Sequence, residues 1–329
     1  MKNTKYVAFL CLLALVVFGC STIVRDTQNK FPVESFTQVK KTHIINICTV
    51  VEGEQVCTFS INPGHFLGPK LGVGSGVIVG HTDRSTLILT AAHVCSSPIE
   101  KEKNLKEKFE SRYPGIRDIK FPEPIGDYEN VKEIKVETTL FVADLENKLH
   151  VAKVVDKIDS HDLCLLQTIE RLNYPVVPFA SDPPPIGEEV YNTAAPLGIF
   201  KKGMVPLFSG YFAGLCDDET FFCPKRAKES FVYTSMVIAP GSSGSPVYRK
   251  INGNFYLFSV IHSVHIHLPE IAYGTTYDQT KNFLNRALGK AYAEAALRKA
   301  IREITPEDMG NVAGNGEMLD AGTDLEPVE

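Results

Sequence analysis

Two apolar runs decide the fold: GSGVIV at residues 74–79 and LILTAAHV at residues 87–94. Each has the β-branched and apolar composition of a short buried strand. The second run ends in two alanines and then His93, and these small neighbours leave room for another strand or a substrate beside the imidazole. A general base needs a ring that is held in place but open on one side. A histidine after a strand is more often structural, so this motif indicates catalysis only in combination with the two further motifs described below.

Similar short runs recur along the chain, between breaks rich in Gly, Pro, Asn and Asp. Many short strands with such breaks predict an all-β protein, built as a sandwich or as barrels. The additional runs lie at residues 44–51, 140–143, 163–166, 189–192, 211–215, 232–236 and 256–261.

Composition shifts mark a connector and several appendages in the β body. A proline-rich stretch indicates the connector, a charged stretch indicates an insertion, and apolar residues at helical spacing predict a C-terminal helix. The seven acidic and no basic residues after residue 304 predict a disordered tail. The expected segments are a signal peptide (1–19), a tether (20–41), a first β region (42–172, with the insertion at about 97–130), a connector (173–185), a second β region (186–276), the helix (277–304) and the tail (305–329).

Composition also limits the function. The 329 residues are 44% apolar and 22% charged, as in ordinary globular proteins, and the net charge is −5. The chain therefore lacks the basic footprint of a nucleic-acid-binding protein, and we expect no nucleic-acid partner.

The N-terminus has the pattern of an export signal. Two lysines precede an apolar run at residues 6–19, which is too short to span a bilayer. The run closes with VFGC at 17–20, which resembles the lipobox of bacterial lipoproteins. By this resemblance, Cys20 carries lipid and anchors the exported protein to the cell envelope, at the outer membrane or the outer leaflet. An ordinary signal peptide that contains a cysteine is the alternative.

Six cysteines remain beyond this segment, an even number in an oxidising compartment, which predicts disulfides. They are Cys48, Cys57, Cys95, Cys164, Cys216 and Cys223. The first two flank a hairpin turn at 51–54 and the last two bracket an acidic loop, so each pair could close a short loop. A metal site is the rival interpretation, but no CxxC or Cys/His cluster has zinc spacing.

A second motif, SHDLCLL at 160–166, places Asp162 at the opening of an apolar strand. A half-buried carboxylate there can accept the imidazole N–H, which fixes the tautomer and stabilises the imidazolium. Asp156 and Asp159 compete for this role, and a solvated strand-end aspartate is the alternative. We favour Asp162 because the strand begins directly after it.

A third motif is the Gly/Ser stretch APGSSGSPV at 239–247. Acyl transfer needs an exposed hydroxyl and backbone N–H groups that point at the developing oxyanion. Glycines on both sides allow the sharp backbone that this requires. An ordinary turn is the alternative for the motif taken alone.

Together, the three motifs resemble those of chymotrypsin-fold (trypsin-like) serine proteases of the bacterial type. TAAH matches that family's histidine motif, DLCLL its aspartate strand and GSSGSP its nucleophile loop. The resemblance implies two six-stranded antiparallel Greek-key barrels, with the site between them, and a C-terminal helix. It also implies His93 as general base, Asp162 as its orienter and Ser243 as nucleophile, with the N–H groups of Gly241 and Ser243 as the oxyanion hole.

The same resemblance bears on the two remaining cysteines and on activation. The segments after His93 and Asp162 are neighbours in the family, so we hypothesise a Cys95–Cys164 disulfide; two buried free thiols are the alternative. Ser242 stands where digestive proteases carry an aspartate that captures a new N-terminus. We therefore expect no zymogen switch of that kind.

Specificity is suggested by VIHS at 260–263, which is expected to line the primary pocket. Glutamyl endopeptidases also carry GSP after their serine and an Ile-His pair here, whose histidine binds the substrate's Glu carboxylate. By that resemblance, His262 binds a Glu or Gln at P1. That family places a Thr where this chain has Ile238, and the neighbouring Val237 carries no charge. An apolar pocket is therefore the alternative, and an Arg or Lys preference is not expected.

The predicted function is that of an exported serine endopeptidase that acts on protein or peptide substrates and is held at the membrane through Cys20. The rival is a catalytically silent protease-fold lipoprotein that acts as a binding or scaffolding module. No cofactor is expected. His265 and His267 have the spacing of alternate strand residues, but a lone H-x-H is more often incidental, and no metal is assigned.

Overall fold

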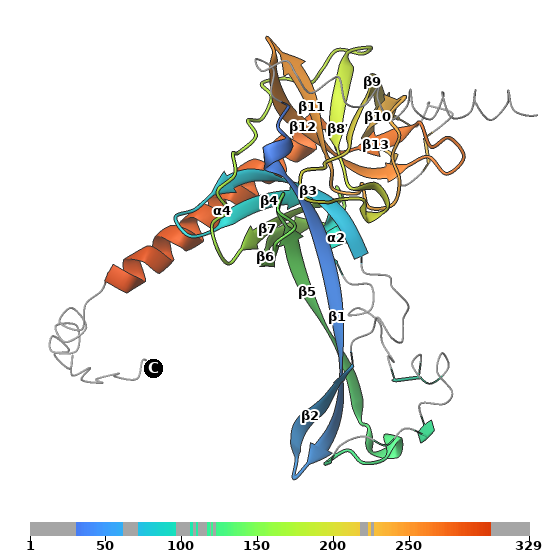
Figure 1. Ribbon diagram of the computed structural model, residues 1–329, viewed down its shortest axis with the longest axis vertical. Helices are drawn as coiled ribbons and strands as arrows, with labels where there is room; N and C mark the ends of the chain where they lie inside the picture. Colours follow the sequence, from blue (N-terminus) through green and yellow to red (C-terminus); the bar gives the residue numbers. More distant parts are fainter. Residues whose placement is uncertain are drawn as a thin grey trace, which may run out of the picture.

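The structure is a computed structural model that describes residues 31–61, 72–96, 106–107, 110, 117–118, 120, 123–217, 223–224 and 227–303. Its strands form two closed antiparallel barrels followed by a long helix (Figure 1), which confirms the predicted fold class. The expected signal peptide, Cys20, most of the 97–130 insertion and the acidic tail lie outside the described residues.

The first barrel has six strands that pair in the order β1–β3–β4–β7–β6–β5, and β5 closes the barrel on β1. The third strand along the chain therefore pairs with the sixth, which is a Greek-key arrangement. The strands are β1 (Phe36–Val51), β3 (Gly72–His81), β4 (Thr86–Thr90), β5 (Glu133–Ala143), β6 (Leu149–Ile158) and β7 (Leu163–Thr168).

The second barrel repeats this order: β8–β9–β10–β13–β12–β11, with β11 closing on β8. Burial along β9 alternates with period two, because successive side chains point to opposite faces of a strand. The strands are β8 (Glu189–Thr193), β9 (Leu207–Cys216), β10 (Ser230–Thr234), β11 (Pro246–Ile251), β12 (Asn254–Val264) and β13 (Ala272–Gly274).

The C-terminal helix α4 (Tyr277–Glu303) packs against both barrels. It begins with a capping box: Gln279 N–H donates to Thr276 Oγ1 (3.3 Å), and Thr276 N–H donates to Gln279 Oε1 (3.0 Å). Only one stretch of its apolar face, around Phe283 and Ala287, is buried in the core shared with Leu89 of the first barrel and Leu257 of the second. None of the described helices is long and apolar enough to cross a bilayer.

A connector crosses from one barrel to the other before β8. Val177 N–H donates to Ile78 C=O in the first barrel (3.1 Å), and Ala180 N–H donates to Leu257 C=O in the second (2.8 Å). Main-chain hydrogen bonds therefore tie the middle of the connector to both barrels.

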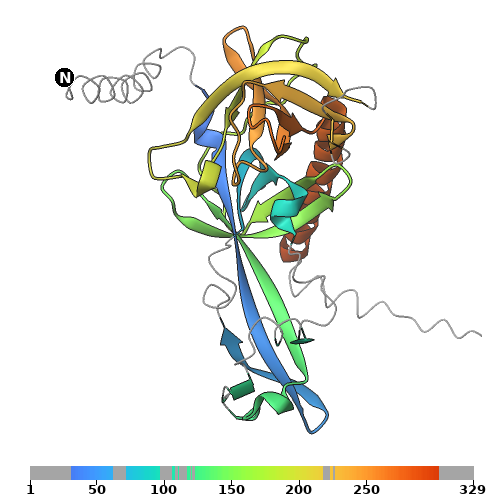
Figure 2. The same ribbon diagram turned by 90° about the vertical axis from the view of Figure 1, so that its right-hand side faces the viewer.

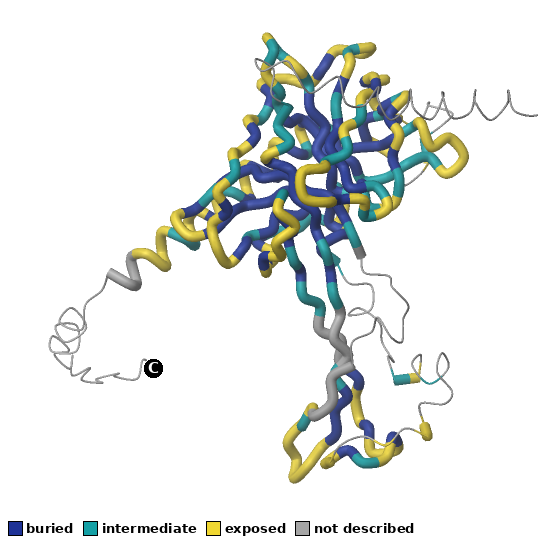
Figure 3. The backbone as a smooth tube through the Cα atoms, in the orientation of Figure 1, coloured by how far each residue is buried: buried dark blue, intermediate teal, exposed yellow. Residues whose placement is uncertain are grey.

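An arm projects from the first barrel (Figures 1 and 2). It consists of the extensions of β1 and β5 together with β2 (Glu54–Ile61), which pairs with β1. Buried residues at its tip, among them Ile47, Tyr128 and Val131, lie apart from those of the barrels (Figure 3). The Cys48–Cys57 disulfide joins β1 and β2 there, as expected for a hairpin.

The folded body starts before residue 42, where the first barrel was expected. β1 begins at Phe36, and the ring of Phe31 lies 4.4 Å from that of Phe255 in the second barrel. Polar residues hid this strand in the sequence, because Gln38 and Lys41 are buried in it. Residues 31–41 therefore belong to the folded body, and only residues before Phe31 remain for the expected tether.

Candidate active site

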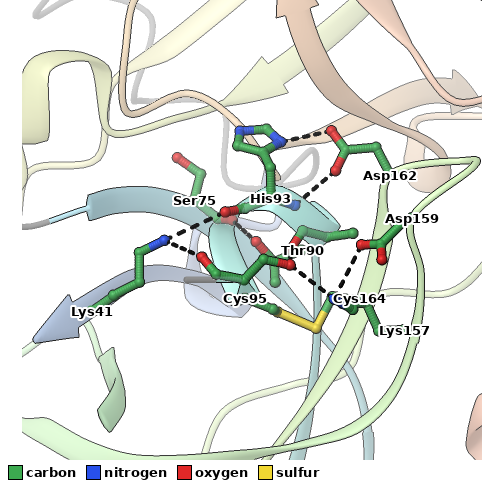
Figure 4. Close-up of a disulfide and its surroundings, with 11 residues drawn as sticks. Lys41, Ser75, Thr90, His93, Cys95, Lys157, Asp159, Asp162 and Cys164 are labelled. Atoms are coloured by element: carbon green, nitrogen blue, oxygen red, sulfur yellow. Dashed lines mark hydrogen bonds and ion pairs between the residues drawn. A yellow bond between two sulfur atoms is a disulfide. The ribbon is translucent and has the colours of Figure 1, made fainter. Parts of the chain in front are cut away.

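His93 lies on a one-turn helix, α2 (Ala92–Cys95), which follows β4. Ala91 and Ala92 are buried, whereas half of the His93 side chain is exposed, so the ring is open to solvent as a general base requires. The ammonium of the buried Lys41 donates to Ser96 C=O (2.6 Å) and His93 C=O (3.4 Å) and anchors this segment (Figure 4).

Asp162 binds His93 with both carboxylate oxygens. Its Oδ1 accepts the His93 backbone N–H at 2.8 Å, and its Oδ2 lies 2.6 Å from Nδ1 (Figure 4). Asp162 has a left-handed φ of 52°, which aspartate tolerates better than most residues. Burial raises the pKa of Asp162, but the hydrogen bonds from His93 outweigh this effect and hold the pKa below its usual range.

The competing aspartates have other partners. Asp156 pairs with Arg286 of α4 at 2.8 Å, and Asp159 pairs with Lys157 at 3.1 Å. Of the three candidates, Asp162 is therefore the one that the structure brings to His93.

A disulfide joins the segments that carry the base and its partner. Cys95 and Cys164 are bonded, with Cα atoms 6.6 Å apart and both residues buried. Lys157 adds a hydrogen bond to Ser96 Oγ (2.9 Å) beside it (Figure 4). The hypothesised pairing is formed in the structure, and so is the third disulfide, Cys216–Cys223.

The loop of Ser243 abuts the segment of His93. A Cβ on Gly244 would lie 2.9 Å from Ala91 N and 2.1 Å from Thr90 Oγ1, and Gly244 has a φ of 85°. Only glycine allows this approach, which brings the loop from the second barrel against the first. In the described part of the chain no hydrogen bond joins the His93 ring to Ser243, and before substrate binds such contacts are often long.

Two main-chain N–H groups of this loop are set up as donors. Pro240 C=O accepts Leu197 N–H (2.5 Å), and Ser242 C=O accepts Ser245 N–H (2.9 Å). Since C=O and N–H point in opposite directions in a trans peptide, the N–H groups of Gly241 and Ser243 point away from these partners. Among the described residues neither N–H donates a hydrogen bond, so both are available to an oxyanion.

The charges of Asp162 and His93 both act on the pKa of His262. Its Nε2 is 2.9 Å from Ser230 Oγ and its Nδ1 is 2.9 Å from Ser263 Oγ. Burial lowers the pKa of His262 to about 4, although the charge of Asp162 opposes this shift, so the ring is neutral at neutral pH.

The other predicted substrate contacts differ in exposure. Ile238 is buried in the core of the second barrel, whereas Val237 is 57% exposed. His265 Nδ1 accepts the N–H groups of His267 and Leu268. Among the described residues no group of three or more His, Cys, Asp and Glu side chains could hold a metal ion.

Sequence reasoning missed two residues of this site. Lys41 had no signal, because a lysine in a polar-looking stretch is usually solvated. Ser230, the partner of His262, opens β10 and is separated from His262 by 32 positions, so no motif links them.

Several solved structures are similar to this chain at low sequence identity. One is the inactive serine-to-alanine mutant of Rv3671c from M. tuberculosis H37Rv (15% identity, 82% of this chain and 94% of that chain, TM-score 0.47). The active form of the Rv3671c protease gives 16% identity, 80% and 86% coverage and a TM-score of 0.47. The serine endoprotease from Yersinia pestis gives 16% identity, 78% and 63% coverage and a TM-score of 0.45.

No protein in a curated sequence collection matches the chain. The family model described as trypsin-like peptidase domain matches residues 74–255, which is more than half of the chain and contains all three motifs. The chain belongs to the trypsin-like peptidase family.

Proposed function

We propose that this protein is a serine endopeptidase with Ser243 as nucleophile, His93 as general base and Asp162 as its orienter. The observation that carries the proposal is the pair of hydrogen bonds between His93 and Asp162, next to a loop in which the N–H groups of Gly241 and Ser243 have no acceptor among the described residues. His93 takes the proton of Ser243 Oγ as the oxygen attacks the substrate carbonyl. The N–H groups of Gly241 and Ser243 stabilise the oxyanion, and His93 then protonates the leaving amine, which leaves an acyl-enzyme for water to hydrolyse.

For the substrate, we propose Gln or an apolar residue at P1 in preference to Glu. Both ring nitrogens of His262 meet serine hydroxyls, and the ring carries no charge at neutral pH because its pKa is about 4. A neutral set of donors and acceptors suits an amide, whereas an ionised Glu would be buried without a cation. Equal cleavage after Leu, Gln and Glu would discard a role for His262.

We further propose that the protein is exported and anchored through lipid on Cys20. Three disulfides are expected of a protein that folds in an oxidising compartment. Cys20→Ser is expected to release the protein from the membrane fraction. Persistence of the variant in that fraction would contradict the anchor and leave the enzymatic proposal intact.

The decisive experiment treats purified residues 21–329 with a labelled fluorophosphonate, beside Ser243→Ala. We expect labelling that depends on Ser243, and a loss of roughly 10⁶-fold in kcat in the variant. Ser259→Ala, a buried serine whose Oγ donates to Thr275 C=O, is the matched control and should still be labelled. Absence of labelling in the parent protein would favour the catalytically silent alternative.

A further inference from the structure

One motif of the sequence, Gly74-Ser75-Gly76, has no part in the chemistry proposed above. Ser75 lies on β3 of the first barrel and is completely buried. A buried hydroxyl is costly unless it is hydrogen-bonded, so its partners show what it does.

Ser75 contacts the second barrel with both its side chain and its backbone. Its Oγ donates to Gly241 C=O (2.9 Å) and accepts Ala195 N–H (2.9 Å), and its own N–H donates to Ser243 C=O (2.7 Å). Its C=O accepts Thr90 Oγ1 (2.7 Å), next to the segment of His93 (Figure 4). One residue of the first barrel therefore holds the carbonyls of both residues whose N–H groups form the oxyanion hole.

These contacts matter because the oxyanion loop depends on a glycine. Gly241 has a φ of 99°, and a Cβ at this position would lie 2.5 Å from Ala195 C=O. Glycine has an unusually wide choice of backbone conformations, so its peptide planes need external partners to stay in one orientation. The peptide before Gly241 is held by Leu197. The peptide after it is held on its carbonyl side by Ser75 and on its N–H side by Ala239 C=O, which accepts Ser242 N–H (2.9 Å).

The hydroxyl of Ser75 also links the segment of Leu197, which holds the peptide before Gly241, to the peptide after Gly241. It accepts the N–H of Ala195, two residues before Leu197, while it donates to Gly241 C=O. Both flanking positions are crowded. A Cβ on Gly74 would lie 3.1 Å from Ser243 C=O of the second barrel and 2.6 Å from the methyl groups of Val94, and one on Gly76 would lie 2.8 Å from Ile88 Cγ2.

We propose that Ser75 is a positioning residue that holds the oxyanion loop of the second barrel in its productive shape from the first barrel. The expected loss of kcat rests on the proposed function, whereas the expected change in the conformation of the loop does not. Loss of the hydroxyl leaves Gly241 C=O and Ala195 N–H without this partner, and the loop gains the freedom to turn its donors away from the oxyanion. The effect falls on kcat, since these donors act where charge develops.

The test compares Ser75→Ala with Ser259→Ala, which removes an equally buried hydroxyl that also donates to a carbonyl, that of Thr275, outside the loop. With a peptide amide substrate and active sites titrated by fluorophosphonate, we expect Ser75→Ala to lower kcat by about 10- to 100-fold with KM nearly unchanged. Ser259→Ala should stay within about twofold of the parent. Ser75→Cys fills the same space with a weaker donor, so its kcat should lie between those of the parent and Ser75→Ala. This variant separates lost hydrogen bonding from lost packing.

A kcat for Ser75→Ala within twofold of the parent, per titrated site, would overturn the proposal, as would an equal loss in Ser259→Ala. Amide hydrogen exchange of residues 239–245 provides a readout that needs no activity. We expect faster exchange in Ser75→Ala and not in Ser259→Ala. If the parent protein is not labelled, the enzymatic proposal fails, whereas unchanged exchange in Ser75→Ala would reject the role of Ser75 itself.

Discussion

The two barrels share one strand order but position their parts of the site by different means. In the first barrel, His93 is held by side chains and by a covalent bond: both oxygens of Asp162, the ammonium of Lys41 and the Cys95–Cys164 disulfide. In the second barrel, Ser243 lies on a loop that is held mainly by main-chain hydrogen bonds, together with the hydroxyl of Ser75 from the first barrel, and is shaped by glycines with positive φ.

The two halves of the site are therefore sensitive to different substitutions. The half that carries His93, called the base side below, depends on the chemical identity of a few side chains, so a nearly isosteric change of one group disturbs it. The half that carries Ser243, called the nucleophile side below, depends mainly on backbone conformation. Adding a single methyl group to one of its glycines therefore disturbs it even though no polar group is removed. Each half can therefore be broken by a substitution that the other half would tolerate.

Among the substitutions that test this comparison, the largest effect is expected from Asp162→Asn, which breaks the base side. The amide keeps the size of the side chain but cannot hold His93 in the tautomer that the proposed mechanism needs for accepting the Ser243 proton. We expect kcat to fall about 10⁴-fold, measured on a peptide amide. The control is Asp156→Asn, which weakens the ion pair with Arg286 of α4 and should leave kcat near that of the parent. Similar losses in both variants would show that Asp162 acts only through stability.

The covalent part of the base side is tested by removing the Cys95–Cys164 disulfide with alanine at both positions. The bond spans 69 residues, and a loop of this length stabilises the folded state by about 4 kcal/mol through the unfolded chain. Removing Cys216–Cys223, which spans 7 residues, should cost about 2 kcal/mol. Urea unfolding measures both, and a larger loss from the short loop would contradict this ranking.

Gly241→Ala is the matching change on the nucleophile side. The new Cβ would lie 2.5 Å from Ala195 C=O, and the φ of 99° is unfavourable for alanine, so the loop must shift. We expect the loss of one oxyanion donor, about 3 kcal/mol in the activation free energy of kcat. Gly53→Ala is the control: its φ of 87° is similar, but no atom lies within 4 Å of the added Cβ. It should lower stability slightly and leave kcat unchanged, and a comparable loss of kcat would attribute the effect to backbone strain alone.

The same difference explains what the sequence could predict. The strands and the His93, Asp162 and Ser243 motifs were accessible because strand periodicity and local spacing carry them, and the two-barrel arrangement followed from the family that these motifs resemble. Lys41, Ser75 and Ser230 were not assigned a role, because their partners are 32 or more positions away in the chain and only the closed barrels bring them together. The start of β1 was hidden for a related reason: its buried polar residues find partners across the fold, and local composition does not reveal them.

The comparison also extends to His262, which belongs to the second barrel but is held by side chains. Its pKa is about 4 in the folded protein against 6.5 as the ordinary value, so between these pH values the unfolded chain binds a proton that the folded protein does not. The free energy of unfolding should therefore fall as the pH drops from 6.5 to 4, by as much as ~3 kcal/mol.

Urea titrations at several pH values measure this slope, which His262→Asn should flatten. His267→Asn, at an exposed position, is the control and should retain it. Asp162 does not produce the same slope. The pKa of Asp162 lies below its ordinary value of 3.8, so its contribution is lost only as the pH falls below that region. A slope that persists in His262→Asn would place the acid sensitivity elsewhere and remove the support for a neutral ring that favours Gln over Glu.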